Sequence, residues 1–108
     1  METISFDEFK KIDIRTATIV EAEDVPESEK LVKLQVDLGG ETRQIIAGIK
    51  NSYPPESLKG RNIIIVANLA PRDLMGHKSE GMLLATRDSS GIALLAPDRD
   101  VSSGLPIT

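Results

Sequence analysis

A chain of 108 residues without cysteine has no disulfides, no thiolate metal sites and no cysteine nucleophile, and its formal net charge of −4 argues against a general binder of polyanions. Hydrophobic residues make up 40% of the chain, which is enough for one modest core, so we expect a single domain over residues 1–108. No apolar run reaches bilayer-spanning length and the first residues are acidic, so we expect a cytoplasmic protein with no membrane span and no secretory signal.

The first predicted element is a short helix that begins after Ser5. The sequence Ser-Phe-Asp-Glu at this point has the form of a capping box, in which Ser5 caps the helix and Glu8 reaches back to the backbone of Ser5. A helix that continues to Lys11 would place Phe6 and Phe9 on one side. We therefore expect the two rings to act as packing anchors.

Three strands are predicted next. Residues 12–22 are rich in Ile, Val and Thr and predict a long strand. Residues 31–38 alternate between apolar and polar side chains, and the apolar face consists of Val32, Leu34, Val36 and Leu38. Gly39-Gly40 is typical of a two-residue hairpin turn, which leads into a return strand over residues 41–47.

The second half of the chain predicts one short helix and three further strands. Residues 54–60 predict a short helix with Pro at its start and Gly at its end. The apolar run 63–67 predicts a strand buried on both faces, and residues 82–86 and 92–95 predict further strands. This order indicates an all-β fold, a five-stranded barrel of the oligonucleotide/oligosaccharide-binding type (OB-fold) with a short helix between strands 3 and 4; an all-β sandwich is the alternative.

The connection from residue 68 to residue 82 has a composition that favours binding or catalysis. A nucleophile elbow requires Gly two residues before and two residues after the serine, but His77 stands two residues before Ser79 and no orienting acid is indicated. One His and no Cys provide no set of metal ligands, and no glycine-rich phosphate loop is present. We therefore expect no enzyme activity, no cofactor, no metal and no small-molecule substrate.

The distribution of charge favours a nucleic-acid partner. Residues 1–41 carry 5 Lys and Arg against 11 Asp and Glu, whereas residues 42–87 carry 7 against 3. The chain has only three aromatic residues, too few for a base-stacking platform, so recognition would use phosphates and RNA shape. The candidate groove residues are Lys33, Arg43, Arg72, Lys78 and Ser79, for each of which an ordinary solvated surface role is the alternative.

A set of short segments, found in the same order over nearly the whole chain, carries a family resemblance. They are Phe6-Asp7-Glu8-Phe9, Lys11-Ile12-Asp13-Ile14-Arg15, Glu29-Lys30-Leu31, Arg43 with Ala47-Gly48-Ile49, Val66-Ala67-Asn68-Leu69, Pro71-Arg72, Ser79-Glu80-Gly81-Met82 and Pro97-Asp98. Together they resemble the tRNA-binding domain at the C-terminus of bacterial methionyl-tRNA synthetases, which also occurs as a free-standing dimeric tRNA-binding protein.

The resemblance implies an OB barrel that forms a homodimer and binds tRNA by its overall fold. Carried onto this sequence, the binding surface falls on Lys33, Arg43, Asn68, Arg72, Ser79 and Met82, and the charge pattern adds Lys78. Asp73 stands where the family commonly has a basic residue. Two other interpretations stay open, namely a secretion chaperone-like dimer that binds protein, and a module that only dimerises.

Overall fold

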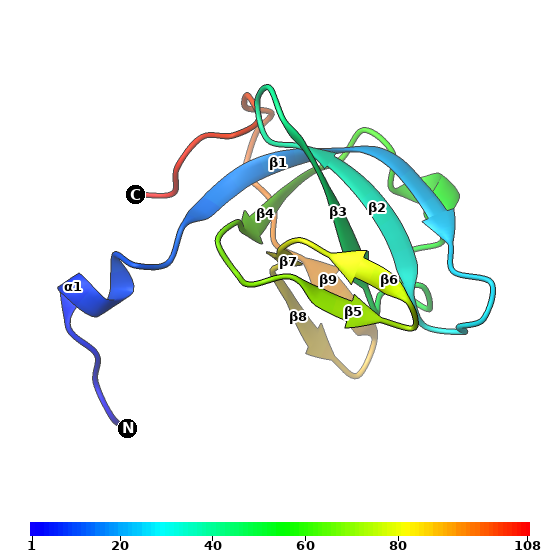
Figure 1. Ribbon diagram of the computed structural model, residues 1–108, viewed down its shortest axis with the longest axis horizontal. Coiled ribbons are helices and arrows are strands. Elements are labelled where there is room, and N and C mark those ends of the chain that lie inside the picture. The colour runs from blue at the N-terminus through cyan, green and yellow to red at the C-terminus, as the bar shows by residue number, and fades with distance from the viewer.

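The barrel is built around one long strand that belongs to two pairings. The computed structural model describes residues 1–108, and Figure 1 shows the strands wrapped around a common centre. The five-stranded antiparallel sheet has the order β3-β2-β1-β4-β7, with bounds Ile14–Asp24 for β1, Val32–Asp37 for β2, Thr42–Ala47 for β3, Asn62–Val66 for β4 and Met82–Leu83 for β7. The first half of β1 pairs with β4 and the second half with β2. A register shift between Ile19 and Glu21 gives the strand the bend that this double role requires.

The sheet closes between β3 and the segment that precedes β7. The backbone N–H of Glu80 donates to the carbonyl oxygen of Gln44 at 2.7 Å, and the N–H of Ile46 donates to the hydroxyl of Ser79 at 3.0 Å. The prediction of an OB-type barrel is therefore confirmed.

Alternation along β2 fills the barrel, as predicted. Val32, Leu34 and Val36 are completely buried and Leu38 is nearly so, while the residues between them are partly exposed. The other large side chains of the core come from β1, β3 and β4 and include Ile19, Ile45, Ile63 and Ile65. The predicted hairpin turn is also confirmed, because Gly39 and Gly40 have φ values of 81° and 113°.

Short elements complete the structure. The 3₁₀-helix η1 (Pro55–Ser57) lies between β3 and β4 and is followed by the fully buried Leu58. The predicted strand 82–86 is divided instead, because the chain leaves β7 at Leu84 and forms a separate hairpin of β8 (Ala85–Asp88) and β9 (Gly91–Leu94). Neither helix has the length or the apolar composition needed to cross a lipid bilayer.

The C-terminal tail lies along the edge of β1, an arrangement that the sequence did not indicate. The hydroxyl of Thr16 donates to the carbonyl oxygen of Ser102 at 2.8 Å, and the N–H of Gly104 donates to the carbonyl oxygen of Thr16 at 2.7 Å. Further along, the N–H of Ile107 donates to the carbonyl oxygen of Ile14 at 2.9 Å. The tail therefore shields β1 and ends near α1 (Figure 1).

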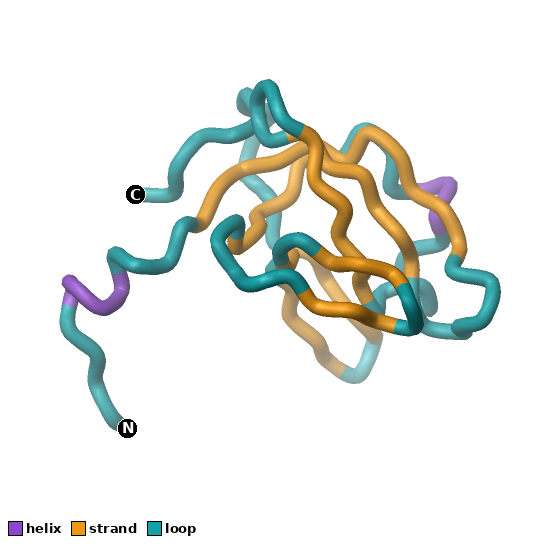
Figure 2. The backbone as a smooth tube through the Cα atoms, in the orientation of Figure 1, coloured by secondary structure: helices purple, strands orange, loops and turns teal.

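Helix α1 (Phe6–Phe9) projects away from the barrel, as Figure 2 shows. Its capping box is confirmed, since the Glu8 N–H donates to the Ser5 hydroxyl at 3.1 Å and the Ser5 N–H donates to the Glu8 carboxylate at 3.0 Å. The helix ends before Lys11. Phe6 and Phe9 are 72% and 45% exposed, so the prediction that they anchor the helix by packing is wrong for a single copy of the chain.

Candidate nucleic-acid interface

The connection from residue 68 to residue 82 folds into a hairpin that lies against β3. Its strands are β5 (Arg72–Leu74) and β6 (His77–Ser79), and its turn consists of Met75 and Gly76 with φ values of 51° and 83°. Positive φ at both central residues is typical of the turns that match the twist of a β-hairpin. The side chain of Gln44 donates to the carbonyl oxygen of Lys78 at 2.7 Å, which fixes β6 beside β3.

An apolar pocket of about 320 Å³ lies next to this hairpin. Seven hydrophobic residues line it. They come from the loop before β2, from β3 and the segment that follows it, and from β5 and β7, namely Leu31, Ile46, Ala47, Ile49, Leu74, Met82 and Leu83. Gly48 and Arg72 complete the wall, so Arg72 supplies the only charge. Met82 is 44% exposed, and together with Arg72 it brings two of the predicted site residues to one pocket.

The four predicted cations differ in whether they are already paired. Lys33 lies 3.2 Å from the carboxylate of Glu23, and Arg43 lies 3.3 Å from that of Glu41. Arg72 and Lys78 are exposed and form no ion pair within the chain. Asp73 stands opposite Lys78 in the hairpin register, yet the two side chains form no ion pair either. Arg72 and Lys78 are therefore the cations most available to an anionic ligand.

Asn68 and Ser79 have polar atoms that are already used within the fold. The Asn68 side chain accepts from the N–H of Asp13 at 2.9 Å and donates to the carbonyl oxygen of Lys11 at 2.6 Å, which ties the segment before β1 to the end of β4. Ser79 is only 5% exposed, and its hydroxyl accepts from Ile46 and donates to the carbonyl oxygen of Gly81 at 3.1 Å. Both residues position the site, and the Ser79 hydroxyl does not reach a ligand at the surface.

Arg43 links β3 to the residue that follows β4. Its guanidinium donates to the carbonyl oxygen of Ala67, directly before Asn68, and also to the carboxylate of Glu41, the residue before β3, at 3.3 Å. The sequence did not indicate a structural role for Gln44. Its side chain also accepts from the side chain of Gln35 at 3.0 Å and so links β2, β3 and β6. A polar residue between charged and apolar neighbours gives no sequence signal for such a role.

A contact between His77 and Glu27 joins the hairpin to the loop between β1 and β2. The imidazole donates from Nε2 to the Glu27 carboxylate at 2.8 Å. This hydrogen bond is the main reason that the pKa of Glu27 lies below its ordinary value of 4.5; a backbone hydrogen bond of Glu27 itself and the nearby charges of His77 and Lys33 lower it further. Because the folded chain depresses the pKa, the stabilising effect is present above the ordinary value and is lost as the pH falls through the lowered value.

We predict that the β5–β6 hairpin loosens as the pH falls through the lowered pKa of Glu27. Hydrogen exchange of the amides of residues 77–79, corrected for its intrinsic pH dependence, should become faster as the pH falls below the ordinary Glu pKa of 4.5. In Glu27→Gln the carboxylate no longer titrates, so most of the acid-induced change should disappear. The Lys33–Glu23 pair stays intact in this variant and serves as an internal control. An unchanged acid response in Glu27→Gln would contradict the prediction.

Comparison with known proteins identifies the family. Residues 14–106 match the family described as "Putative tRNA binding domain". The chain belongs to this tRNA-binding domain family. The match runs from the start of β1 through the C-terminal tail, so it covers the whole barrel and both outer hairpins. The family resemblance found in the sequence is therefore confirmed.

Relatives of this tRNA-binding domain include complete enzymes and free-standing proteins. It is 50% identical to a methionine–tRNA ligase of Chloroherpeton thalassium over 106 residues, which are 97% of this chain and 15% of that protein. The crystal structure of a MetRS-related protein from Pyrococcus horikoshii is 36% identical, with a TM-score of 0.92 and full coverage of both chains. The chaperone CsaA of Bacillus anthracis is 30% identical, with a TM-score of 0.88 over 99% of this chain and 100% of its own.

Proposed function

We propose that this chain binds structured tRNA as a non-catalytic module, through phosphate and shape contacts. The observation that carries the proposal is the pair of exposed, unpaired cations Arg72 and Lys78 on the hairpin of a tRNA-binding domain. Base stacking contributes little, because no aromatic side chain lines the apolar pocket. The single tyrosine, Tyr53, is occupied elsewhere, since its hydroxyl accepts from Leu94 and its ring lies under Arg61.

The chain spans about 15% of the length of the methionine–tRNA ligases that it matches. We propose that it acts in the cytoplasm, either as the C-terminal domain of a methionyl-tRNA synthetase or as a free-standing protein. In both settings it would raise the local concentration of tRNA, and the chemistry of aminoacylation would lie outside this chain.

A salt titration tests the proposal. If about four cations contact phosphates, the logarithm of the association constant for tRNA should fall with the logarithm of salt concentration with a slope of roughly −3 to −4. Filter binding with unfractionated tRNA measures this slope, and a duplex DNA of similar length serves as the control for binding to any polyanion. Absence of tRNA binding, or an affinity that does not change with salt, would contradict the proposed function.

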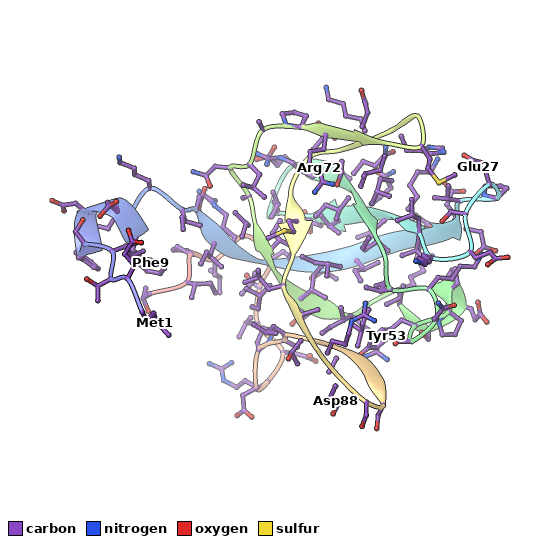
Figure 3. All side chains as sticks on the ribbon, turned by 90° about the horizontal axis from the view of Figure 1, so that it is seen from below. Met1, Phe9, Glu27, Tyr53, Arg72 and Asp88 are labelled. Carbon is purple, nitrogen blue, oxygen red and sulfur yellow. The ribbon has the colours of Figure 1, made fainter.

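We also propose that the chain acts as a dimer and that α1 forms part of the interface. A pocket of about 320 Å³ lies between α1, the start of β1 and the last residues of the chain, and its apolar walls include Phe6, Phe9, Ile12 and Ile107. A helix of four residues with no buried side chain is not stable by itself. Figure 3 shows Phe9 at this end of the molecule, far from the barrel. A second copy of the same surface would cover these side chains by two-fold symmetry.

Replacing Phe6 and Phe9 together by Ser should convert a dimer into a monomer. Neither ring is buried within one copy, so the variant should still fold, while the mass in sedimentation equilibrium falls by half and the melting temperature no longer depends on protein concentration. The affinity for tRNA should fall at least ~10-fold through lost avidity. Leu95→Ser removes another exposed apolar side chain and serves as the control. A variant that keeps the dimer mass would exclude this interface.

A protein-binding, chaperone-like role is the second candidate. It is favoured by the similarity to the chaperone CsaA and by the apolar lining of the pocket beside Arg72. The two candidates differ in what accompanies the protein during purification. Co-purified tRNA, detected from the absorbance ratio of the fresh protein at low salt, supports the tRNA proposal, whereas protein free of nucleic acid that captures unfolded peptides supports the chaperone-like role.

A further inference from the structure

A second pocket adjoins the apolar one and has the opposite character. It also has a volume of about 320 Å³, and Gly48 lines both pockets. Only one of its nine lining residues is hydrophobic, and none is Asp or Glu. Its charges come from Lys30, which precedes β2, and from Arg87 on β8. No sequence pattern indicates that these two residues lie together, and neither was among the predicted site residues.

The pocket is a fixed part of the fold, because hydrogen bonds hold its two walls. The N–H of Ile92 donates to the hydroxyl of Ser52 at 2.9 Å, which attaches the β8–β9 hairpin to the segment after β3. Gly91 has a φ of 119°, a conformation that favours glycine, and a carbon added there would lie 2.8 Å from the same hydroxyl. On the other side, the N–H of Lys50 donates to the carbonyl oxygen of Lys30 at 3.1 Å.

The pocket is lined by hydrogen-bond donors that have no partner within the chain, and no carboxylate lines it. Lys30 and Arg87 are exposed and form no ion pair within the chain. Asp88, the acidic residue of the hairpin, accepts from the N–H of Ser90 at 2.8 Å and does not line the pocket. The remaining donors are the hydroxyls of Ser89 and Ser90 and the amide of Asn51, whose side chains make no hydrogen bond within the chain.

This set of donors fits a phosphate group. A guanidinium and an ammonium provide charge, and hydroxyl and amide groups provide neutral hydrogen bonds, which is the combination that proteins use for phosphate oxygens. We propose that the pocket binds a backbone phosphate of RNA, so that the bound strand passes from Arg72 and Lys78 across Gly48 to Lys30 and Arg87. The inference rests on the proposed tRNA-binding function and extends its footprint to a site that neither the sequence nor the family match assigned.

The glycine between the pockets supports this path. Gly48 is exposed, has no left-handed φ, and a side chain there would meet only the methyl group of Leu31 at 4.0 Å. Glycine is therefore not needed for the backbone or for the core at this position. A bare backbone between two ligand pockets allows a strand to pass close to the surface. Gly48→Val should fold normally and weaken tRNA binding ~10-fold, because its branched side chain would stand in the path.

The direct test compares two double variants of the full chain. Lys30→Gln with Arg87→Gln removes the two pocket cations, and Lys59→Gln with Arg99→Gln removes two cations that line neither pocket. Both variants lower the net charge by the same amount. We expect the first to weaken tRNA binding about 30- to 100-fold and to reduce the salt slope by about 2, and the second to change the affinity less than about threefold. Equal effects of the two variants, or no effect of the first, would overturn the inference.

Binding of tRNA and binding of inorganic phosphate together distinguish a failure of this inference from a failure of the proposed function on which it rests. If the wild-type protein binds tRNA and the pocket variant binds it as tightly as the control variant does, the proposed function stands. The pocket is then not part of the RNA-binding surface. Wild-type protein that binds no tRNA overturns both. In that case, phosphate-induced changes in the amide signals of residues 89–91 would assign the pocket to a free anion, and their absence would assign it no ligand.

Discussion

Replacing Arg72 and Lys78 together by Gln is expected to weaken tRNA binding about 100-fold at physiological salt. A charge-assisted hydrogen bond to phosphate contributes about 1.5 kcal/mol, which corresponds to roughly ten-fold in affinity for each residue. The salt slope should become shallower by about 2. Both side chains are exposed and neither forms an ion pair, so the melting temperature should not change. Filter binding over a range of salt concentrations measures both effects.

The variant that replaces Lys59 and Arg99 provides the matched control. Lys59 pairs with Glu21 at 3.3 Å, and Arg99 donates to the carbonyl oxygen of Asp100, so both lie outside the hairpin and both pockets. Losing them removes the same charge from the protein. If this control weakens tRNA binding as much as the hairpin variant does, the effect comes from net charge and the hairpin is not part of the interface.

Gly104→Ala is expected to be the most destabilising single substitution in the tail. Gly104 has a φ of 82°, a conformation that costs a residue with a side chain about 1–2 kcal/mol. The added carbon would also lie 2.1 Å from the carbonyl oxygen of Leu38, a backbone atom that cannot rotate away. The tail would have to leave β1 and expose Thr16. We expect a loss of about 3 kcal/mol and a fall of roughly 10–20 °C in melting temperature.

Gly60→Ala separates the two causes. Gly60 has a φ of 92°, but a carbon added there would meet nothing within 4 Å. This variant should lose only the cost of the left-handed conformation, about 1–2 kcal/mol. Denaturant unfolding of the two variants gives the difference. Equal losses would show that the contact between the tail and the β2–β3 turn does not stabilise the fold.

The barrel could be predicted from the sequence because its strands follow local rules. The alternation from Val32 to Leu38 and the Gly39-Gly40 turn both determine their structure within a few residues. The hairpin β5–β6 could not be found in this way. Each of its strands has three residues, and its turn begins with Met75, a residue that rarely adopts a positive φ. The tail along β1 depends on contacts such as Thr16 with Ser102, which no local pattern encodes.

The sequence indicated which residue types could contact an anionic ligand, but it did not show which of these side chains are free. Pairing of Lys33 with Glu23 depends on the register between β1 and β2, and pairing of Arg43 with Glu41 depends on the rotamers of the two side chains. Burial of Ser79 depends on closure of the barrel across β3. The exposed rings of α1 could not be anticipated either, because a capping box indicates where a helix begins and not what covers it.

An amide-signal map of the isotope-labelled chain during titration with tRNA tests the proposed binding surface residue by residue. We predict that the largest changes occur over residues 72–78 and 46–49, continue to residues 89–91, and leave residues 62–65 and 98–101 unchanged. Changes confined to α1 and the last residues of the chain, with the β5–β6 hairpin unaffected, would contradict the account, because tRNA would then bind at the surface that we assign to the dimer.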